Sequence, residues 1–445
     1  MLRSRKLLIM SSLMLASCSR AQSVAEPARD LVSTQQSNSV THWHLLATEL
    51  VVDVGPVIDG RAFAIIQAAV HDAVNGIERR YEPYTANLTA PGASLDAAVA
   101  AAAHDVLSAL VPQHQAKIAS EYVAALAAVP DGSAKEAGVA LGHEAARLNL
   151  DRRASDGIPV APWPPTEGPI TEPVFEPTGA PGDYAFTPPF DQPPLGPIAL
   201  FPGWGRLTPF VIDLEKHKLK GPDPIKSRRY ARDLEYVESI GRLNSSTRTD
   251  DQTEIAFFWF ESLAIWNQIA SELIATHGLD EWDAAHRLAL LNFAMTDASI
   301  ACFDAKYHFR FWRPFTAIRR ADEDDNRFTQ PDADWLPLLW TEPDVFPPTF
   351  LIPPIPDYPS AAAVIAAAAG EVLIRHFGDR QRFQATSAFL PGAVRHFTTI
   401  SQAVEESGMS RVYGGIHFQR AVEDGFRQGR SIGRVVSRML PPAEW

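Results

Sequence analysis

The pattern that most constrains this chain is a recurrence of apolar residues every three or four positions, which begins near Gly60. Its first run consists of Phe63, Ile66, Ala69, Val70, Ala73, Val74 and Ile77. Ala-rich segments at 93–110, 114–129 and 133–150 keep the same period, and the alternation typical of strands is scarce. A period of three to four residues predicts helices that each bury one face. The sequence therefore predicts an all-α fold.

Two Pro-rich stretches interrupt the helical pattern, at about 159–209 and at about 336–359. Their density of Pro and Gly excludes regular helix and central strand. An insert as long as the first one is uncommon inside a compact domain and is often functional. Two interpretations remain open for it. It either covers the helices with its aromatic side chains or lines a substrate channel.

The first residues have the character of an export signal, because basic residues within the first six positions precede an apolar run from Leu7 to Leu15. This run is too short to span a bilayer. It ends in Leu-Ala-Ser-Cys, which resembles a bacterial lipobox. We therefore predict a lipoprotein signal peptide at 1–18 and a lipid anchor on Cys18. The alternative is a plain secretory signal with an incidental Cys. Either interpretation predicts an exported protein, in the periplasm or attached to the cell envelope.

Residues 19–40 are rich in Ser, Gln and Ala and predict a flexible tether. Residues 41–445 are expected to form a single helical domain, since 46% of the chain is hydrophobic and can supply a large core. Once Cys18 is acylated, Cys302 is the remaining cysteine, so the mature chain cannot form an internal disulfide.

The formal net charge of −13 bears on possible partners, because it disfavours nucleic acid or an anionic membrane as the partner of the whole surface. We therefore expect small-molecule partners, no nucleic acid, and membrane contact through the lipid anchor alone. The oligomeric state is not determined by the sequence. Any anion site must be a local cluster of cations on an acidic background.

The first candidate segment for such a cluster is 306–314, where Lys306 and Arg313 are seven residues apart. On a continuous helix this spacing puts both cations on nearly the same face, about two turns apart. Two buried cations on one stripe are costly unless they share an anion. Pro314 predicts that the helix ends or bends at Arg313. The alternative is a solvated helix face, although the flanking aromatic residues argue against full exposure.

The second segment runs from Pro359 through Ser360 and Ala361 into an Ala-rich stretch. Ser is a favoured N-cap and Ala is the best helix former, so a helix is expected to begin here. The unpaired N–H groups of a helix N-terminus can bind an anion. The simpler alternative is that Ser360 only caps the helix.

The third segment, 410–424, contains Arg411, a Gly-Gly pair, His417 and Asp424. The glycines are expected to break one element and to allow a close backbone approach. His417 is predicted to open the next helix, which would put Asp424 on the same face seven residues later. There Asp424 could orient a neighbour or pair with Arg411. The alternative for His417 is a structural role.

In their order and residue types, these three segments resemble the signature of the vanadium-dependent haloperoxidase and phosphatidic acid phosphatase type 2 superfamily. That signature consists of Lys, six residues and Arg-Pro; then Pro-Ser-Gly-His; then Ser-Arg, five residues and His. The resemblance extends over about 60–440 and looks closest to the soluble bacterial haloperoxidase-like branch. In the small acid phosphatases an Asp follows the third-motif His by four residues, and here that place is taken by Ala421. The implied fold is two packed four-helix bundles, with the site at the end of one of them.

The resemblance also implies a vanadate cofactor, whose site phosphate could occupy as well. The oxygens of the anion would be bound by Lys306, Arg313, Arg411, the Ser360 hydroxyl and the Ala361 N–H. His417 would bind vanadium in a haloperoxidase or attack phosphorus in a phosphatase. Lys306 and Arg313 would take part in catalysis with it, while Asp424 would support the site.

Three functions follow from this resemblance. A haloperoxidase would use hydrogen peroxide to oxidise a halide that then reacts with an organic acceptor. A phosphatase would hydrolyse a phosphoester through a phospho-His, and an inactive protein would only bind the anion. The chain departs from the family at Ala362, where the family has a His that acts as general acid or base, a contribution of roughly 10²- to 10⁴-fold. His308 is a possible substitute, although we expect it to be packed or at the surface. A purely structural lipoprotein predicts instead that the three cations are scattered on the surface.

Overall fold

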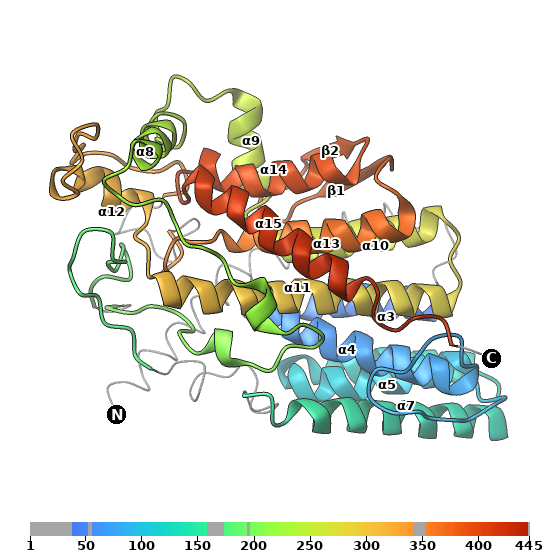
Figure 1. Cartoon of the computed structure of the whole chain (residues 1–445). Coiled ribbons are helices and arrows are strands. Elements are labelled where there is room, and N and C mark those ends of the chain that lie inside the picture. Colours follow the sequence, from blue (N-terminus) through green and yellow to red (C-terminus); the bar gives the residue numbers. More distant parts are fainter. Residues whose placement is uncertain (1–37, 52–55, 158–172, 194–195, 341–351, 444–445) are drawn as a thin grey trace.

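The computed structural model describes residues 38–51, 56–157, 173–193, 196–340 and 352–443 (Figure 1). It is helical apart from one small sheet, which confirms the predicted all-α class. The helices are α3 (Ser39–Leu50), α4 (Pro56–Ile77), α5 (Leu95–Leu110), α6 (Gln115–Ala128), α7 (Ser133–Arg153), α8 (Arg228–Ile240), α9 (Asp250–Phe258), α10 (Ser262–Thr276), α11 (Glu281–Phe309), α12 (Pro314–Arg319), α13 (Ala361–Phe377), α14 (Ile400–Tyr413) and α15 (Gln419–Val436). The strands β1 (Phe383–Thr386) and β2 (Val394–Phe397) pair antiparallel, with Phe383 opposite Phe397.

The helices form two layers that meet along α11 (Figure 1). The N-terminal layer contains α3 to α7, and the C-terminal layer contains α10, α11 and α13 to α15. α11 packs on α4 from the first layer and on α13 from the second. Among the described residues it is also the single unbroken helix long and apolar enough to cross a membrane, but 94% of its apolar window is buried inside the protein. α11 therefore serves as the shared core helix of the two layers.

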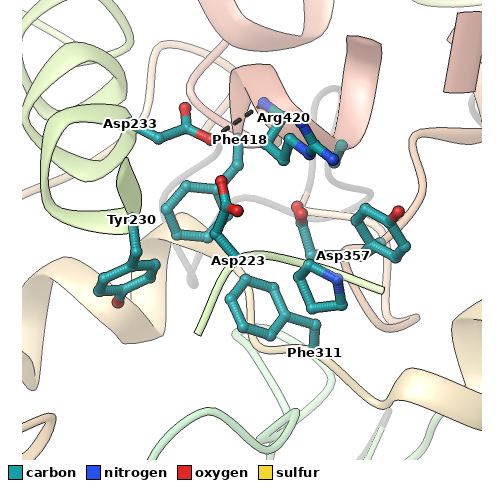
Figure 2. Close-up of a pocket in the computed structure, with 10 residues that line it drawn as sticks. Asp223, Tyr230, Asp233, Phe311, Asp357, Phe418 and Arg420 are labelled. Carbon is teal, nitrogen blue, oxygen red and sulfur yellow. Dashed lines mark hydrogen bonds between the residues drawn. The ribbon is translucent and has the colours of Figure 1, made fainter. Parts of the chain in front are cut away.

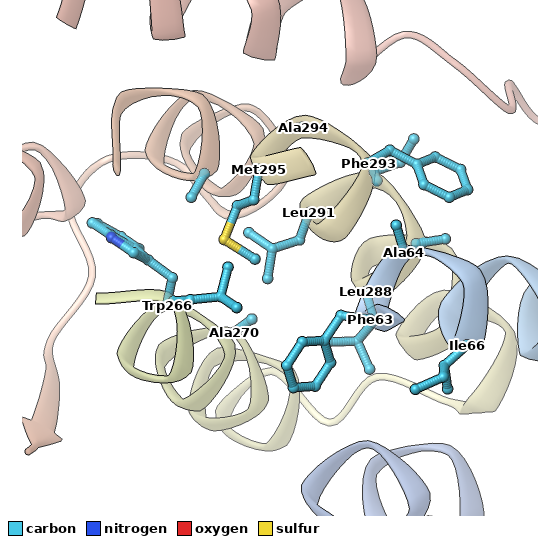
Figure 3. Close-up of a cluster of buried hydrophobic side chains, with 14 of the residues drawn as sticks. Phe63, Ala64, Ile66, Trp266, Ala270, Leu288, Leu291, Phe293, Ala294 and Met295 are labelled. Carbon is cyan, nitrogen blue, oxygen red and sulfur yellow. The ribbon is translucent and has the colours of Figure 1, made fainter. Parts of the chain in front are cut away.

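The core is made of apolar side chains that several helices contribute to one cluster. Figure 3 shows Phe63 of α4, Trp266 of α10, and Leu291 and Met295 of α11 side by side. Each of these side chains is at most 1% exposed. Burial of a large apolar side chain stabilises the fold by about 1.5–3 kcal/mol relative to its exposure. This cluster holds the two layers together and keeps α11 in place beneath the site.

Small residues set the close spacing of the helices that support the site. Gly425, Gly429 and Gly433 of α15 face α13, and a Cβ at Gly429 would come within 2.1 Å of the Val364 carbonyl oxygen. The Ala-rich sequence of α13 allows this approach because its side chains are short. The start of α13 is therefore positioned by direct backbone contact with α15.

The described part of the long Pro-rich insert packs against the chain that follows α11. The Tyr184 N–H donates a hydrogen bond to the Arg310 carbonyl (2.6 Å), and the Trp312 N–H donates one to the Gly182 carbonyl (3.0 Å). These contacts hold the insert at the end of α11, and its role as a cover or as a channel lining stays a prediction. Residues 158–172 and 194–195 of the insert lie outside the described residues, as do 341–351 of the second Pro-rich link.

The N-terminal boundaries differ in part from the prediction. The tether was expected to extend to residue 40, but α3 begins at Ser39 because the Asn38 side chain caps it by accepting a hydrogen bond from the Thr41 N–H. The predicted signal peptide at 1–18, the anchor Cys18 and the rest of the tether lie outside the described residues.

Candidate active site

Lys306 lies in the last turn of α11 and is fully buried. Its Nζ donates hydrogen bonds to the backbone carbonyls of Pro356 (2.8 Å) and Asp357 (2.9 Å). The ammonium group is thus held by the loop that leads to α13. Burial, followed by the charge of Arg313, lowers its pKa to about 7. Burial of this kind disfavours the charged form, and an adjacent anion would favour it.

Arg313 is also fully buried, but it does not share a helix with Lys306 as predicted. The helix ends at Phe309, and Arg310 turns into the left-handed region with φ +52°. Arg313 itself has the extended backbone that a following Pro predicts (φ −80°, ψ 155°). The expected break before Pro314 is therefore confirmed, but it begins four residues earlier than predicted.

The guanidinium of Arg313 is held by neutral groups. It donates to the carbonyls of Ile355 (2.8 Å), Ile416 (2.8 Å) and Pro353 (3.3 Å). Its ion-pair distance to Asp357 is longer, at 3.8 Å. Carbonyl oxygens satisfy the N–H groups but leave most of the positive charge uncompensated, which an anion in the site would balance.

Ser360 is the N-cap residue of α13, as predicted, but it does not cap with its side chain. Its N–H donates to the Ala421 carbonyl (3.0 Å), while its buried hydroxyl has no hydrogen-bond partner. Ala361 and Ala362 in the first helical turn are partly exposed. A buried hydroxyl without a partner beside the N–H groups of a helix N-terminus is the arrangement that an oxyanion would satisfy.

Arg411 lies in the last turn of α14 and is 6% exposed. Its Nη2 donates to the carbonyls of Trp259 and Phe260, the latter at 3.0 Å, and its Nε has no hydrogen-bond partner. Burial lowers its pKa to about 10, while the nearby Glu261 acts in the opposite direction. The pKa of Glu261 is raised to about 7, mainly by its own burial.

His417 lies in the loop between α14 and α15, so the prediction that it opens a helix is wrong; α15 begins at Gln419. The predicted close backbone approach of the Gly-Gly pair is confirmed. Gly415 has φ +74°, and a Cβ there would lie 2.4 Å from the Gly241 carbonyl oxygen. This turn brings the His417 imidazole to Arg313, with Nε2 3.0 Å from Nη1 of the guanidinium.

The charged groups of the cluster change the pKa of His417, so they lie close to it in the protein. The pKa of His417 is lowered well below its ordinary value, first by burial and then by the cations Arg313, Lys306 and Arg411. The imidazole is therefore neutral near pH 7 and carries a free lone pair on one nitrogen. The alternative of three cations scattered on the surface is wrong, since all three are buried.

The structure separates Asp424 from this cluster. Two roles were predicted for Asp424, and its contacts fit the first one, the orientation of a neighbour. Its carboxylate accepts a hydrogen bond from the Tyr358 hydroxyl and pairs with Arg420 (2.9 Å). The predicted pairing with Arg411 is not among its contacts. Because α15 begins two residues after His417, their expected common helical face does not exist.

His308 is exposed, as expected for a surface residue, and does not replace the missing family His. It lines a separate cavity of about 80 Å³ together with His217, Asp304 and Gln428.

Two acidic residues of the site were missed at the sequence level. The first is Asp357, whose fully buried carboxylate lies 2.9 Å from Nδ1 of His417. The second is Glu261, which caps α10 by accepting from the Leu263 N–H (3.0 Å). A carboxylate three residues before Ser360 in a Pro-rich loop was the available signal for Asp357. Nothing in the local sequence connects Glu261 with Arg411, 150 positions away.

The donor set suits an oxyanion better than a bare metal cation. The site offers Lys and Arg side chains, a Ser hydroxyl, helix N–H groups and one imidazole. Within the described part of the chain, no three His, Cys, Asp or Glu side chains are grouped as a cation site would need. Vanadate would fit this set, because its oxygens could accept from the donors and the imidazole could supply a nitrogen ligand.

Comparisons with known proteins agree with this geometry. A family model described as the VCPO second helical-bundle domain matches residues 286–441, the part of the chain that contains all three segments. Vanadium chloroperoxidase of Curvularia inaequalis is 25% identical over 466 aligned positions, which cover 82% of this chain and 74% of that protein.

Solved structures share the fold over most of the chain. The crystal structure of the first bacterial vanadium-dependent iodoperoxidase superposes with a TM-score of 0.73 at 24% identity, covering 91% of this chain and 96% of that one. An apo-type bacterial vanadium-dependent chloroperoxidase gives a TM-score of 0.67 at 17% identity, covering 86% and 93%. Residues 286–441 therefore match the second helical-bundle domain of that family model, and the chain as a whole shares its fold with vanadium-dependent haloperoxidases.

Proposed function

We propose that this protein is a vanadate-dependent haloperoxidase that oxidises halide with hydrogen peroxide, weakened by the loss of the second-motif His. The observation that carries the proposal is the convergence of three buried cations, a partnerless buried Ser hydroxyl and a neutral imidazole. Its haloperoxidase-like relatives support the same chemistry.

Each residue of the cluster would have a distinct task toward the anion. Lys306, Arg313 and Arg411 would donate charge-assisted hydrogen bonds to its oxygens. The Ser360 hydroxyl and the Ala361 N–H would add neutral donors. The lone pair of His417 Nε2 would bind vanadium once Arg313 gives up its 3.0 Å contact with that nitrogen.

Bound vanadate would supply a Lewis-acidic centre that activates hydrogen peroxide toward a halide. The chain's residues would keep this centre charged, oriented and shielded from water, because the donors are buried and fixed by backbone carbonyls. No side chain at position 362 can move a proton, since Ala362 stands in the first turn of α13 where the family has His. We therefore expect slower turnover, with easily oxidised halides such as iodide affected least.

The proposal is tested on full-length protein prepared with orthovanadate. We expect one vanadium per chain and peroxide-dependent oxidation of iodide, both lost in His417→Gln. Bound vanadium without halide oxidation would indicate an inactive binder and contradict the proposal. Release of phosphate from a generic phosphoester by the vanadate-free protein would identify the phosphatase alternative. The same cationic site can serve that reaction because the phosphoryl-transfer transition state has a similar shape.

We also propose that the protein is exported and held at the cell envelope by a lipid on Cys18. The basic start, the apolar run and the lipobox-like end of residues 1–18 support this. Labelling cells with a radioactive fatty acid should mark the wild-type protein and leave Cys18→Ser unmarked. An unlabelled wild-type protein would leave the plain secretory signal as the better interpretation.

A further inference from the structure

Asp357 lies just before the second segment and contacts the other two segments that build the site. Its N–H donates to the Phe311 carbonyl (2.8 Å), and its carbonyl accepts from Lys306 (2.9 Å). Its carboxylate Oδ1 lies 2.9 Å from Nδ1 of His417, and neither side chain is more than 5% exposed. The residue therefore connects the imidazole with the loop that carries Ser360.

The imidazole of His417 lies between two groups of opposite hydrogen-bonding character. Its Nδ1 lies 2.9 Å from the carboxylate of Asp357, and Nη1 of Arg313 lies closer to Nε2 (3.0 Å) than to Nδ1 (3.4 Å). A carboxylate can only accept a hydrogen bond and a guanidinium can only donate one. Both carboxylate oxygens of Asp357 are buried without a hydrogen-bond partner in the structure. A neutral imidazole with its proton on Nδ1 and its lone pair on Nε2 would match the hydrogen-bonding character of both neighbours.

A carboxylate in an anion site needs a separate explanation, because its charge repels the ligand that the three cations attract. The other side of Asp357 borders a small cavity of about 10 Å³, lined also by Asp223, Asp233 and Arg420, with room for about one water molecule (Figure 2). Charge attraction toward an oxyanion therefore does not account for Asp357, whereas its contact with the imidazole does.

We propose that Asp357 is a positioning residue for His417: its carboxylate holds the proton at Nδ1 and so keeps the lone pair of Nε2 available to the vanadium. For the identity of the anion, this inference rests on the proposed function. Carboxylate partners of metal-binding His residues act in the same manner, and their loss costs about 10- to 100-fold in metal affinity. The backbone carbonyl of Asp357 also lies near His417, so the experiment must separate the contribution of the carboxylate.

The first test compares two anions on the full chain by calorimetry. Vanadate needs the Nε2 lone pair, whereas sulfate responds to charge and neutral donors alone. In Asp357→Asn we expect the Kd for vanadate to rise by about 10- to 100-fold, and the Kd for sulfate to fall, because a repelling charge is removed. A loss of both affinities would mean a merely structural role, and a gain of both would mean a purely electrostatic one. Either result overturns the proposal.

Asp233→Asn is the matched control. Asp233 is a partly buried carboxylate whose two oxygens accept from the N–H groups of Gln419 (2.8 Å) and Arg420 (2.9 Å) at the start of α15, and Asn keeps one of these two acceptors. This variant removes a negative charge near Asp357 without removing a contact to His417. We expect both anions to change little and in the same direction. Opposite changes in this control would attribute the effect to charge at a distance and overturn the proposal.

The second test reads the tautomer of His417 directly in anion-free protein. The chain contains 13 His residues, so the His417 signal in a long-range proton–nitrogen spectrum is assigned by its loss in His417→Gln. We expect the Nδ1–H form in the wild type and a mixture of both forms in Asp357→Asn. The Nε2–H form in the wild type would overturn the proposal without any variant at position 357. This readout decides the role of Asp357 even if the wild type binds no vanadate, a result that would defeat only the proposed function.

Discussion

Gly429 of α15 packs directly on the backbone of Val364 in α13, so closely that a Cβ at position 429 would come within 2.1 Å of the Val364 carbonyl oxygen. Val364 also donates its N–H to the Ser360 carbonyl (3.0 Å) in the first turn of α13. The contact between the two helices therefore sets the position of the helix N-terminus that borders the site.

Gly429→Ala should push α13 away from α15. Overpacking of this kind costs about 1–3 kcal/mol of unfolding free energy, and we expect weaker vanadate binding as well. The control is Gly60→Ala in α4. A Cβ added at this position would make only ordinary contacts, at 3.7 Å. Replacement of a helical Gly by Ala should stabilise the protein by up to about 1 kcal/mol. Urea unfolding measures both changes, and equal midpoints for the two variants would contradict the role given to Gly429.

Ser360→Ala should separate anion binding from helix capping. The buried Ser360 hydroxyl has no partner, so its removal relieves a desolvation cost and should raise the unfolding free energy, by up to about 1–3 kcal/mol. Vanadate affinity should fall several-fold, the equivalent of one lost hydrogen bond of about 0.5–1.5 kcal/mol. Ser227 does cap α8, by accepting from the Tyr230 N–H, and Ser227→Ala should cost about 1 kcal/mol without affecting the anion. A destabilised Ser360→Ala protein would show that the hydroxyl is a structural cap after all.

Ala362→His should restore the general acid or base that the family has at this place. Ala362 is partly exposed in the first turn of α13, so a larger side chain has room. We expect peroxide-dependent bromide oxidation to rise by about 10²-fold or more, with vanadate affinity unchanged within a few-fold. Ala362→Gln controls for size, since it cannot transfer a proton in this pH range. If only phosphoester hydrolysis increases, the ancestral chemistry is that of a phosphatase.

Anion binding should take up protons near neutral pH. Burial lowers the pKa of Lys306 to about 7. A nearby anion favours the protonated form of this amine and so raises its pKa. Affinity for sulfate, which does not titrate here, should therefore fall as the pH rises from about 7 to 9. Calorimetry in buffers of different ionisation enthalpy measures the uptake, which should shrink in Lys306→Met. Proton release on binding would contradict this account.

The lowered pKa of Lys306 also makes the stability of the anion-free protein depend on pH. Its pKa is lower in the folded state than the ordinary 10.5, so the unfolded chain binds more protons between about pH 7 and 10.5. The destabilisation that a buried, charged Lys306 causes is therefore greatest below about pH 7. It decreases as the pH rises across this window. The difference in unfolding free energy between Lys306→Met and the wild type, measured by urea unfolding, should accordingly become smaller as the pH increases. A difference that does not vary with pH would contradict a buried, charged Lys306.

The local properties of this protein were determined by its sequence. Periodic apolar residues specify the helices, because a helix that buries one face needs that period. Pro314 forces an extended Arg313, and the alanines that follow Ser360 favour the start of α13, since both effects act between neighbours in the chain. The residue types and spacings of the three segments were likewise enough to name the cations and the imidazole that meet in the cluster.

Tertiary structure alone decided how those groups are held. The end of α11 at Phe309, the tight turn at Gly415, and the contacts of Asp357 with His417 and of Asp424 with Tyr358 all join segments that are distant in sequence. No local preference encodes such distances, because they depend on how whole helices pack. Backbone carbonyls that bind Lys306 and Arg313 carry no sequence signal at all, since every residue has one.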